Sequence, residues 1–388
     1  MTKIPNIAFV YDWFDTSFGG AERVIQILHD QFPYAIWYTS HIDRSSVSWT
    51  NGWDIRTSFI QKLPLWFRRR RLLCLLLLPL AFESFDMSEY DVVVSITSAF
   101  AKAIVTRTKT RHICYLLTPP RWLYNDQKPI FNFQLFRWLE SKVRTYLKRW
   151  DYISAQRVDE FVSISQEVAK RCIEYYKRES EVIYPPFDAK YWKQKVKSIS
   201  SRYPLSAKQY YLIVSRLESY KKVDLGIEAY ANFKGQNPNI KIWNNCINMV
   251  VVGRGSQRSN LYTLAHRLGV NEEMIWLDNI DDCELAWLYA NCKAFIMPQE
   301  EDFGYVACEA MACLAPIIAF DHGGQVEVLK EYSNKIMCKE QTVECFTRAL
   351  EKIDSIEYNA NTYENRNIRR WSRHSFVAAF TQKITQTI

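Results

Sequence analysis

Short apolar runs alternate with amphipathic segments along the first half of the chain. NIAFVY (6–11), DVVVSI (91–96) and HICYLL (112–117) are continuous apolar runs, as expected for strands that are buried on both faces of a parallel sheet. The segment AERVIQILHDQF (21–32) has its apolar residues at helical spacing instead. Two further strands, AIWYTS (35–40) and FVSIS (161–165), and the helix QEVAKRCIEYY (166–176) complete a first series of βαβ units.

A second series begins after YPPFD (184–188), where two prolines predict a boundary. Its expected strands are YYLIVS (210–215), NMVVVG (248–253), MIWL (274–277), AFIMP (294–298) and PIIAF (316–320). We therefore predict an α/β fold with two doubly wound, Rossmann-like domains facing each other across a cleft. The first spans 1–185 and the second 186–370, with a C-terminal helix at 371–388 that could pack back on the first domain.

Composition agrees with two packed domains. The chain has 388 residues, of which 48% are hydrophobic and 24% charged, and this excludes a disordered, collagenous or coiled-coil protein. The net charge is +8, and residues 1–190 carry +6 of it. This imbalance favours an anionic partner, such as a phosphate, a nucleic acid or a membrane surface.

The ten cysteines are scattered and include no C-x-x-C pair, and the six histidines form no ligand-spaced cluster. We expect no metal site and reduced cysteines in a cytoplasmic protein. The first residues lack the pattern of a signal peptide, and the longest apolar run, 72–82, is too short for a transmembrane helix.

The segment EDFGYVACE (301–309) is the most informative motif, because it follows the strand at 294–298 and leads into a helix. Glu301 would lie in the loop and Glu309 about two turns into the helical region. The backbone N–H groups of Phe303, Gly304, Tyr305 and Val306 would open the helix and offer an anion site. We expect a diphosphate there, although a capped helix with two solvated acids would show the same spacing.

A second motif, SRLESYKKVD (215–224), also follows a buried strand. Arg216 and Lys221 stand five residues apart across a strand-to-helix loop and could reach one pair of phosphates. Neutralising a leaving diphosphate lowers the barrier of a transfer reaction. A solvated basic turn is the alternative.

Glycine pairs follow three other strands. Gly19 and Gly20 permit a close backbone approach and left-handed dihedral angles, although an ordinary turn would also contain them. Gly253 and Gly255 supply only two glycines of a dinucleotide fingerprint, which is weak support for NAD and equally suits a loop near a nucleotide base. The HGG sequence at 322–324 also follows a strand and would shape the pocket for the donor.

The order GGAERV, SRLESYKKVDL, VVGRG, EDFGYVACEAMA and HGG resembles the retaining glycosyltransferases of family four, which have the GT-B fold. Within that family the chain is similar to bacterial mannosyltransferases of surface-polysaccharide assembly. The resemblance implies that Glu301 positions the donor sugar, that Glu309 holds the ribose, and that Arg216 and Lys221 bind the diphosphate. It also implies that the Gly20 loop completes the phosphate cradle and that no metal or other cofactor is tightly bound.

One position departs from the family pattern. Relatives often have His-Thr-Pro where this chain has Leu117-Thr118-Pro119. The histidine normally lies against the donor sugar, so Leu117 removes a polar contact.

Residues 62–82, KLPLWFRRRRLLCLLLLPLAF, place four arginines beside an apolar stretch. This is typical of an interfacial helix on anionic lipid, while a buried helix with a solvated basic end is the alternative. We expect peripheral contact with the inner face of the cytoplasmic membrane and a lipid-linked acceptor. No nucleic-acid motif accompanies the basic residues, so we expect no nucleic-acid partner.

These features favour transfer of mannose from GDP-mannose to a lipid-linked glycan in O-antigen, lipopolysaccharide or exopolysaccharide assembly. Another donor, such as a UDP-hexose or a deoxysugar nucleotide, remains an alternative. A non-catalytic nucleotide-sugar-binding partner is a second one, favoured only by Leu117. A dehydrogenase is disfavoured by the incomplete glycine fingerprint.

Overall fold

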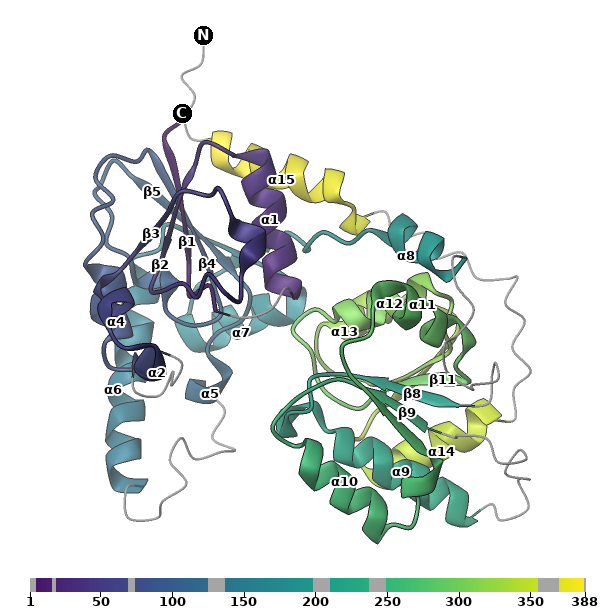
Figure 1. The fold of residues 1–388 in the computed structure, drawn as a ribbon. Helices are drawn as coiled ribbons and strands as arrows, with labels where there is room; N and C mark the ends of the chain where they lie inside the picture. Colours follow the sequence, from purple (N-terminus) through teal and green to yellow (C-terminus); the bar gives the residue numbers. More distant parts are fainter. Residues whose placement is uncertain are drawn as a thin grey trace. The chain divides into compact units, whose positions relative to one another are not determined.

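A computed structural model of the chain describes residues 5–15, 19–68, 74–124, 137–197, 210–236, 249–354 and 370–386. The chain forms two compact units (Figure 1). The N-terminal unit comprises Met1–Pro186 and Arg373–Ile388, and the C-terminal unit comprises Phe187–Ser372. Each contains a parallel sheet with helices on both faces, which confirms the predicted pair of Rossmann-like domains.

In its described residues the N-terminal unit has a seven-stranded sheet in the order β3-β2-β1-β4-β5-β6-β7. Its strands are β1 (Ile7–Tyr11), β2 (Ile36–Thr39), β3 (Ile55–Thr57), β4 (Val92–Thr97), β5 (Arg111–Leu116), β6 (Glu160–Ser163) and β7 (Ser180–Val182). The five strands expected from the apolar runs are confirmed to within a residue or two. Strand addition changes direction between β1 and β4, which makes this pair the topological switch point of the sheet.

Helices cover both faces of this sheet. They are α1 (Gly20–Gln31), α2 (Leu65–Arg68), α4 (Leu78–Glu83), α5 (Arg121–Tyr124), α6 (Arg137–Gln156), α7 (Gln166–Tyr176) and α15 (Arg373–Thr385), with short 3-10 helices η1 (Ser48–Thr50), η2 (Phe59–Lys62) and η3 (Ala101–Ala103). The C-terminal helix α15 lies beside α1, and its Phe376 and Phe380 pack on Tyr115 of β5 at ring distances of 5.9 and 5.3 Å. Helices α4, α6 and α7 lie on the opposite face (Figure 1).

The C-terminal unit has a six-stranded sheet in the order β10-β9-β8-β11-β12-β13 in its described residues. Its strands are β8 (Tyr211–Val214), β9 (Met249–Val252), β10 (Met274–Leu277), β11 (Ala294–Met297), β12 (Ile317–Phe320) and β13 (Lys335–Cys338). Its helices are α8 (Ala189–Val196), α9 (Val223–Gln236), α10 (Arg258–Arg267), α11 (Asp282–Asn291), α12 (Tyr305–Ala312), α13 (Gln325–Leu329) and α14 (Val343–Asp354), with η5 (Ser219–Lys221) and η6 (Asn271–Glu273). The predicted strands are again confirmed, except that Asn248 lies outside the described residues. The switch point of this sheet lies between β8 and β11.

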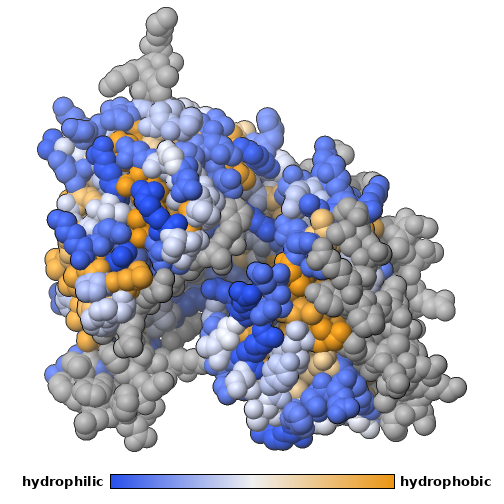
Figure 2. Space-filling view, in the orientation of Figure 1, coloured by the Kyte–Doolittle hydropathy of each residue, from blue (hydrophilic) through white to orange (hydrophobic). Residues whose placement is uncertain are grey.

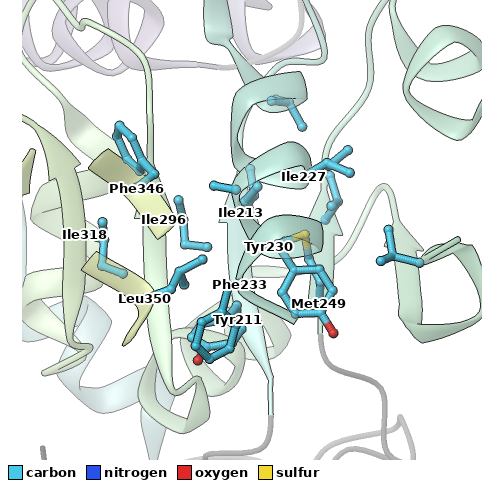
Figure 3. Close-up of a cluster of buried hydrophobic side chains, with 14 of the residues drawn as sticks. Tyr211, Ile213, Ile227, Tyr230, Phe233, Met249, Ile296, Ile318, Phe346 and Leu350 are labelled. Carbon is cyan, nitrogen blue, oxygen red and sulfur yellow. The ribbon is translucent and has the colours of Figure 1, made fainter. Parts of the chain in front are cut away.

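The core of the C-terminal unit forms where α9, α10 and α14 pack on one face of the sheet. Figure 3 shows side chains from both layers meeting there, including Ile213 and Ile296 from the strands and Ile227, Phe346 and Leu350 from the helices. All five are at most 2% exposed. This packed layer holds the strands rigidly, so the loops at their carboxyl ends have a fixed base.

The expected helix over residues 62–82 is not continuous in the part that is described. This stretch forms the end of η2, then α2, and then α4 beginning at Leu78, while Arg69, Arg70 and Arg71 lie outside the described residues. Leu78 and Phe82 are at most 3% exposed and belong to the core. The apolar run therefore has mostly the buried role that was its alternative, although Leu76 and Leu80 are more than half exposed.

Candidate functional site

The residues singled out in the C-terminal sequence converge on the switch point of the C-terminal sheet. Arg216 and Lys221 follow β8, and Glu301 follows β11. These two strands are neighbours, with Ala294 paired to Tyr211. In open α/β sheets the crevice for a ligand forms at the carboxyl ends of such a strand pair. The topology thus brings together two loops that are separated by 80 residues of sequence.

An ion pair joins these two loops. The Lys221 ammonium lies 2.5 Å from Oε1 of Glu301, with the side chains only 10% and 18% exposed. Gln299 Nε2 donates a second hydrogen bond to the same oxygen at 3.0 Å. The cation and the carboxylate predicted for one site are therefore in direct contact.

The side chain of Gln325 fixes the backbone of the Glu301 loop. Its Oε1 accepts from the Glu301 amide at 2.9 Å, and its Nε2 donates to the carbonyls of Gln299 and Phe320 at 2.9 and 3.1 Å. Gln325 is completely buried. The Gly324 amide also donates to the Glu301 carbonyl at 2.8 Å, so hydrogen bonds join the Glu301 loop and the HGG loop directly.

Helix α12 begins directly after this loop. Gly304 precedes it with φ +99°, a left-handed conformation that favours glycine, and the helix runs from Tyr305 to Ala312. Tyr305 and Val306 are thus its first two residues, as predicted. Phe303 lies before the helix and is buried, with its ring 6.0 Å from that of Trp371. The helix N-terminus adjoins the Lys221–Glu301 pair and has the partial positive charge that attracts anions.

Glu309 occupies the fifth position of α12, just over one turn into the helix instead of the predicted two. It is only 5% exposed, and the Tyr289 hydroxyl of α11 points to its Oε2 at 3.5 Å. Burial and then the Glu309 carboxylate raise the pKa of Tyr289 well above its usual value, so this hydroxyl stays protonated and donates. Contact of Glu309 with a ribose stays a prediction.

Arg216 differs from Lys221 in being exposed. Both cations lie near the Tyr220 ring, with the Arg216 guanidinium 5.9 Å and the Lys221 ammonium 5.3 Å from its centroid. One aromatic ring thus supports both cations through cation–π contact. That both reach a single diphosphate stays a prediction.

The glycines after β9 have a structural explanation. A Cβ on Gly253 would lie 1.8 Å from the carbonyl oxygen of Ser215, and one on Gly255 would lie 2.3 Å from that of Leu217. The two loops are also joined by a hydrogen bond of 2.7 Å from the Leu217 amide to the Arg254 carbonyl. These glycines therefore let the Arg216 loop pack closely on its neighbour, and contact of Gly253 with a substrate stays a prediction.

The switch point of the N-terminal unit is occupied by a side chain of the chain itself. Asp12 follows β1 and is 1% exposed. Its carboxylate accepts hydrogen bonds from the backbone amides of residues 98–101 and from the Thr97 hydroxyl, all at 2.8–3.0 Å. Gly19 has extended backbone with φ −144°, and Gly20 is the first residue of α1, so neither uses the left-handed region that glycine permits. A role of Gly19 and Gly20 in a phosphate cradle stays a prediction.

Sequence reasoning missed three residues of the C-terminal site, namely Tyr220, Gln299 and Gln325. Gln299 directly follows the Pro298 that ends a predicted strand, and Gln325 directly follows the HGG sequence. Their positions could have drawn attention, but an isolated glutamine has no motif. Gln299 is 1% exposed and its Oε1 has no hydrogen-bond partner among the described residues.

The described residues contain neither a metal-binding cluster nor a membrane-spanning helix. No group of three or more His, Cys, Asp or Glu side chains is arranged to hold a metal ion there. None of the helices in that part of the chain has the length and apolar character needed to cross a membrane.

Comparison with known families gives one match, to residues 197–370, for the family described as glycosyl transferases group 1. The matched stretch includes Arg216, Lys221, Glu301 and Glu309. This part of the chain is therefore similar to group 1 glycosyltransferases.

Among curated proteins, an uncharacterized glycosyltransferase of Methanocaldococcus jannaschii is 29% identical over 146 residues, which are 37% of this chain and 35% of that protein. The human alpha-1,3/1,6-mannosyltransferase ALG2 is 24% identical over 387 residues, covering 90% of this chain and 87% of that protein. The first several relatives are matched over half of their length or less.

Two solved structures resemble the whole chain. HepE of Anabaena in complex with UDP-glucose has a TM-score of 0.65 at 17% identity, covering 98% of this chain and 99% of that one. WaaG, a glycosyltransferase involved in lipopolysaccharide biosynthesis, has a TM-score of 0.64 at 15% identity and covers 98% and 99%. At these identities the likeness concerns the fold, which is GT-B, as predicted.

Proposed function

We propose that the chain is a retaining group 1 glycosyltransferase that transfers a hexose from a nucleotide sugar to a saccharide acceptor. The observation that carries the proposal is the Lys221–Glu301 pair at the switch point of the C-terminal sheet, 2.5 Å apart beside the start of α12. A cation, a helix N-terminus and a carboxylate in one place match two parts of a nucleotide sugar. The cation and the helix N-terminus suit the anionic diphosphate, and the carboxylate suits the hydroxyl-bearing sugar.

In this reaction Arg216 and Lys221 bind the diphosphate and neutralise the charge that develops on it as the sugar leaves. The amides of Tyr305 and Val306 at the start of α12 add to this stabilisation. Glu301 accepts hydrogen bonds from the sugar hydroxyls, and Glu309 accepts them from the ribose. The leaving phosphate oxygen takes the proton of the acceptor hydroxyl, so the new bond forms on the face of the sugar that the diphosphate leaves.

For the donor we propose GDP-mannose and for the acceptor a lipid-linked glycan of O-antigen or exopolysaccharide assembly. Similarity to the mannosyltransferase ALG2 over 90% of the chain supports mannose, and the likeness to WaaG supports a surface polysaccharide. A UDP-hexose is the alternative donor, supported by the UDP-glucose that HepE binds. A deoxysugar nucleotide is a further alternative.

We also propose that the N-terminal unit contacts anionic lipid from the cytoplasmic side. Phe59, Leu65, Trp66, Leu76 and Leu80 are 41–62% exposed within one short stretch of the chain, and the sequence places Arg69–Arg71 in the same stretch. Figure 2 shows apolar side chains at the surface over α4. Exposed apolar side chains beside basic ones are typical of a surface that binds the membrane interface.

Turnover of a panel of nucleotide sugars tests the proposal. Purified protein is incubated with GDP-mannose, UDP-glucose, UDP-galactose and a deoxysugar nucleotide in the presence of bacterial membrane extract. We expect one donor to be consumed, and we expect Arg216→Ala to lower the rate by about 100-fold or more because it removes charge stabilisation of the leaving group. Arg254→Ala, which removes an exposed arginine of the neighbouring loop, is the matched control.

Nucleotide binding without turnover of any donor would instead favour a non-catalytic partner, the role that Leu117 suggests. Leu117 directly follows β5, where a polar residue could contact a sugar. Consumption of a donor that is unaffected by Arg216→Ala would contradict the assignment of the diphosphate site.

A further inference from the structure

We propose that Glu301 competes with the diphosphate for Lys221, and that this competition makes the site favour an intact nucleotide sugar over the nucleoside diphosphate product. The inference rests on the proposed function. In the structure the Glu301 carboxylate is paired with the Lys221 ammonium group that a diphosphate would bind. A ligand therefore has to break an existing ion pair before it gains one.

The carboxylate is held where it competes. Gln299 Nε2 donates to the same Oε1 that contacts Lys221, at 3.0 Å, and Gln325 fixes the Glu301 amide at 2.9 Å. The amide orientation of Gln299 is determined by this contact, because only its NH₂ group can donate to a carboxylate. Glu301 is thus attached at both its backbone and its side chain, whereas Lys221 ends a flexible four-carbon chain. When the pair separates, Lys221 is the partner that moves.

The N-terminal unit offers a comparison, because a carboxylate is firmly fixed at the switch point of its sheet. At its switch point Asp12 receives five hydrogen bonds, four of them from backbone amides, and is 1% exposed. A ligand could replace it only by breaking all five of these hydrogen bonds. The Lys221–Glu301 pair, in contrast, consists of two side chains that keep 10% and 18% of their surface exposed. This pair can be opened by a ligand that reaches it.

A nucleotide sugar and a nucleoside diphosphate differ in the hydrogen-bond donors that they provide to Glu301. A nucleotide sugar takes Lys221 but offers sugar hydroxyls, which donate hydrogen bonds to the released carboxylate. A nucleoside diphosphate takes Lys221 and leaves Glu301 half-buried without a cation, next to a second anion. Leaving a partly buried charge unpaired is costly, so the product binds more weakly than its phosphate contacts alone would allow. The apparent association constant for the product is the intrinsic constant multiplied by the fraction of molecules in which Lys221 is free.

Equilibrium binding of GDP and of UDP, measured by calorimetry, tests this competition. The variants are Glu301→Gln, Lys221→Met and the double substitution, with Glu273→Gln as matched control because Glu273 pairs with Lys234 elsewhere in the same unit. We expect Glu301→Gln to bind the nucleotide that the wild-type protein prefers about three- to tenfold more tightly. We expect no such gain from Glu301→Gln in the Lys221→Met background, and none from Glu273→Gln.

The double substitution separates competition from simple repulsion. If Glu301 only repelled the phosphates, its neutralisation would improve binding equally with and without Lys221, and this result would overturn the inference. Unchanged or weaker binding by Glu301→Gln would also overturn it, while nucleotide binding by the wild-type protein would leave the proposed function standing. Absence of GDP and UDP binding to both the wild-type protein and Glu301→Gln would overturn the competition and would refute GDP-mannose and UDP-hexoses as donors.

Discussion

Replacing Gln325 by leucine should destabilise the C-terminal unit far more than an ordinary glutamine-to-leucine change. Gln325 is completely buried and makes three hydrogen bonds with the backbone of Glu301, Gln299 and Phe320. Leucine has nearly the same volume but cannot donate or accept. At about 1 kcal/mol for each net hydrogen bond, we expect a loss of about 3 kcal/mol in the free energy of unfolding.

Gln341 offers a matched control. Its side chain makes one hydrogen bond, of 2.8 Å from Nε2 to the Pro298 carbonyl, and it is half-buried. Gln341→Leu should therefore cost about 1 kcal/mol. Urea unfolding followed by far-ultraviolet circular dichroism measures both values. Equal losses in the two variants would refute the reasoning that Gln325 holds the Glu301 loop. We also expect Gln325→Leu, but not Gln341→Leu, to weaken nucleotide binding.

Two further predictions concern the N-terminal unit. Burial, followed by the charge of Arg157, lowers the pKa of His112 to about 3, so between pH 6.5 and 3 His112 takes up a proton only when the unit unfolds. As the pH is lowered through that range, the free energy of unfolding should fall by up to about 1.4 kcal/mol for each pH unit. In His112→Asn, urea unfolding should show a weaker dependence of this free energy on pH. An unchanged pH dependence would contradict the assignment. Trp66→Ala should reduce co-sedimentation with phosphatidylglycerol vesicles at low salt about three- to tenfold, whereas Tyr262→Ala, an exposed aromatic of the C-terminal unit, should leave it unchanged. Equal sedimentation of both variants would contradict lipid contact around α2.

Local patterns were sufficient for the elements of both sheets. The runs at 6–11 and 274–277 became β1 and β10, and the helix expected at 166–176 is α7 without any change of bounds. A continuous apolar run has few alternatives to a buried strand when turn residues bound it on both sides. Patterns failed over residues 62–82, because an apolar stretch beside arginines reads the same whether it meets lipid or the core. Only the tertiary structure showed that Leu78 and Phe82 pack in the core while Trp66 and Leu80 are exposed.

The sequence by itself determined that Arg216, Lys221 and Glu301 lie in loops at strand ends, since each follows a strand that its apolar run makes recognisable. Only the tertiary structure decided that Lys221 and Glu301 touch, that Gln325 fixes the Glu301 loop, and that Gly253 is required by the neighbouring loop. Such contacts join residues 24 to 80 positions apart and depend on the order in which strands pair. Strand order is set by the packing of the whole sheet, and no local stretch of sequence encodes it.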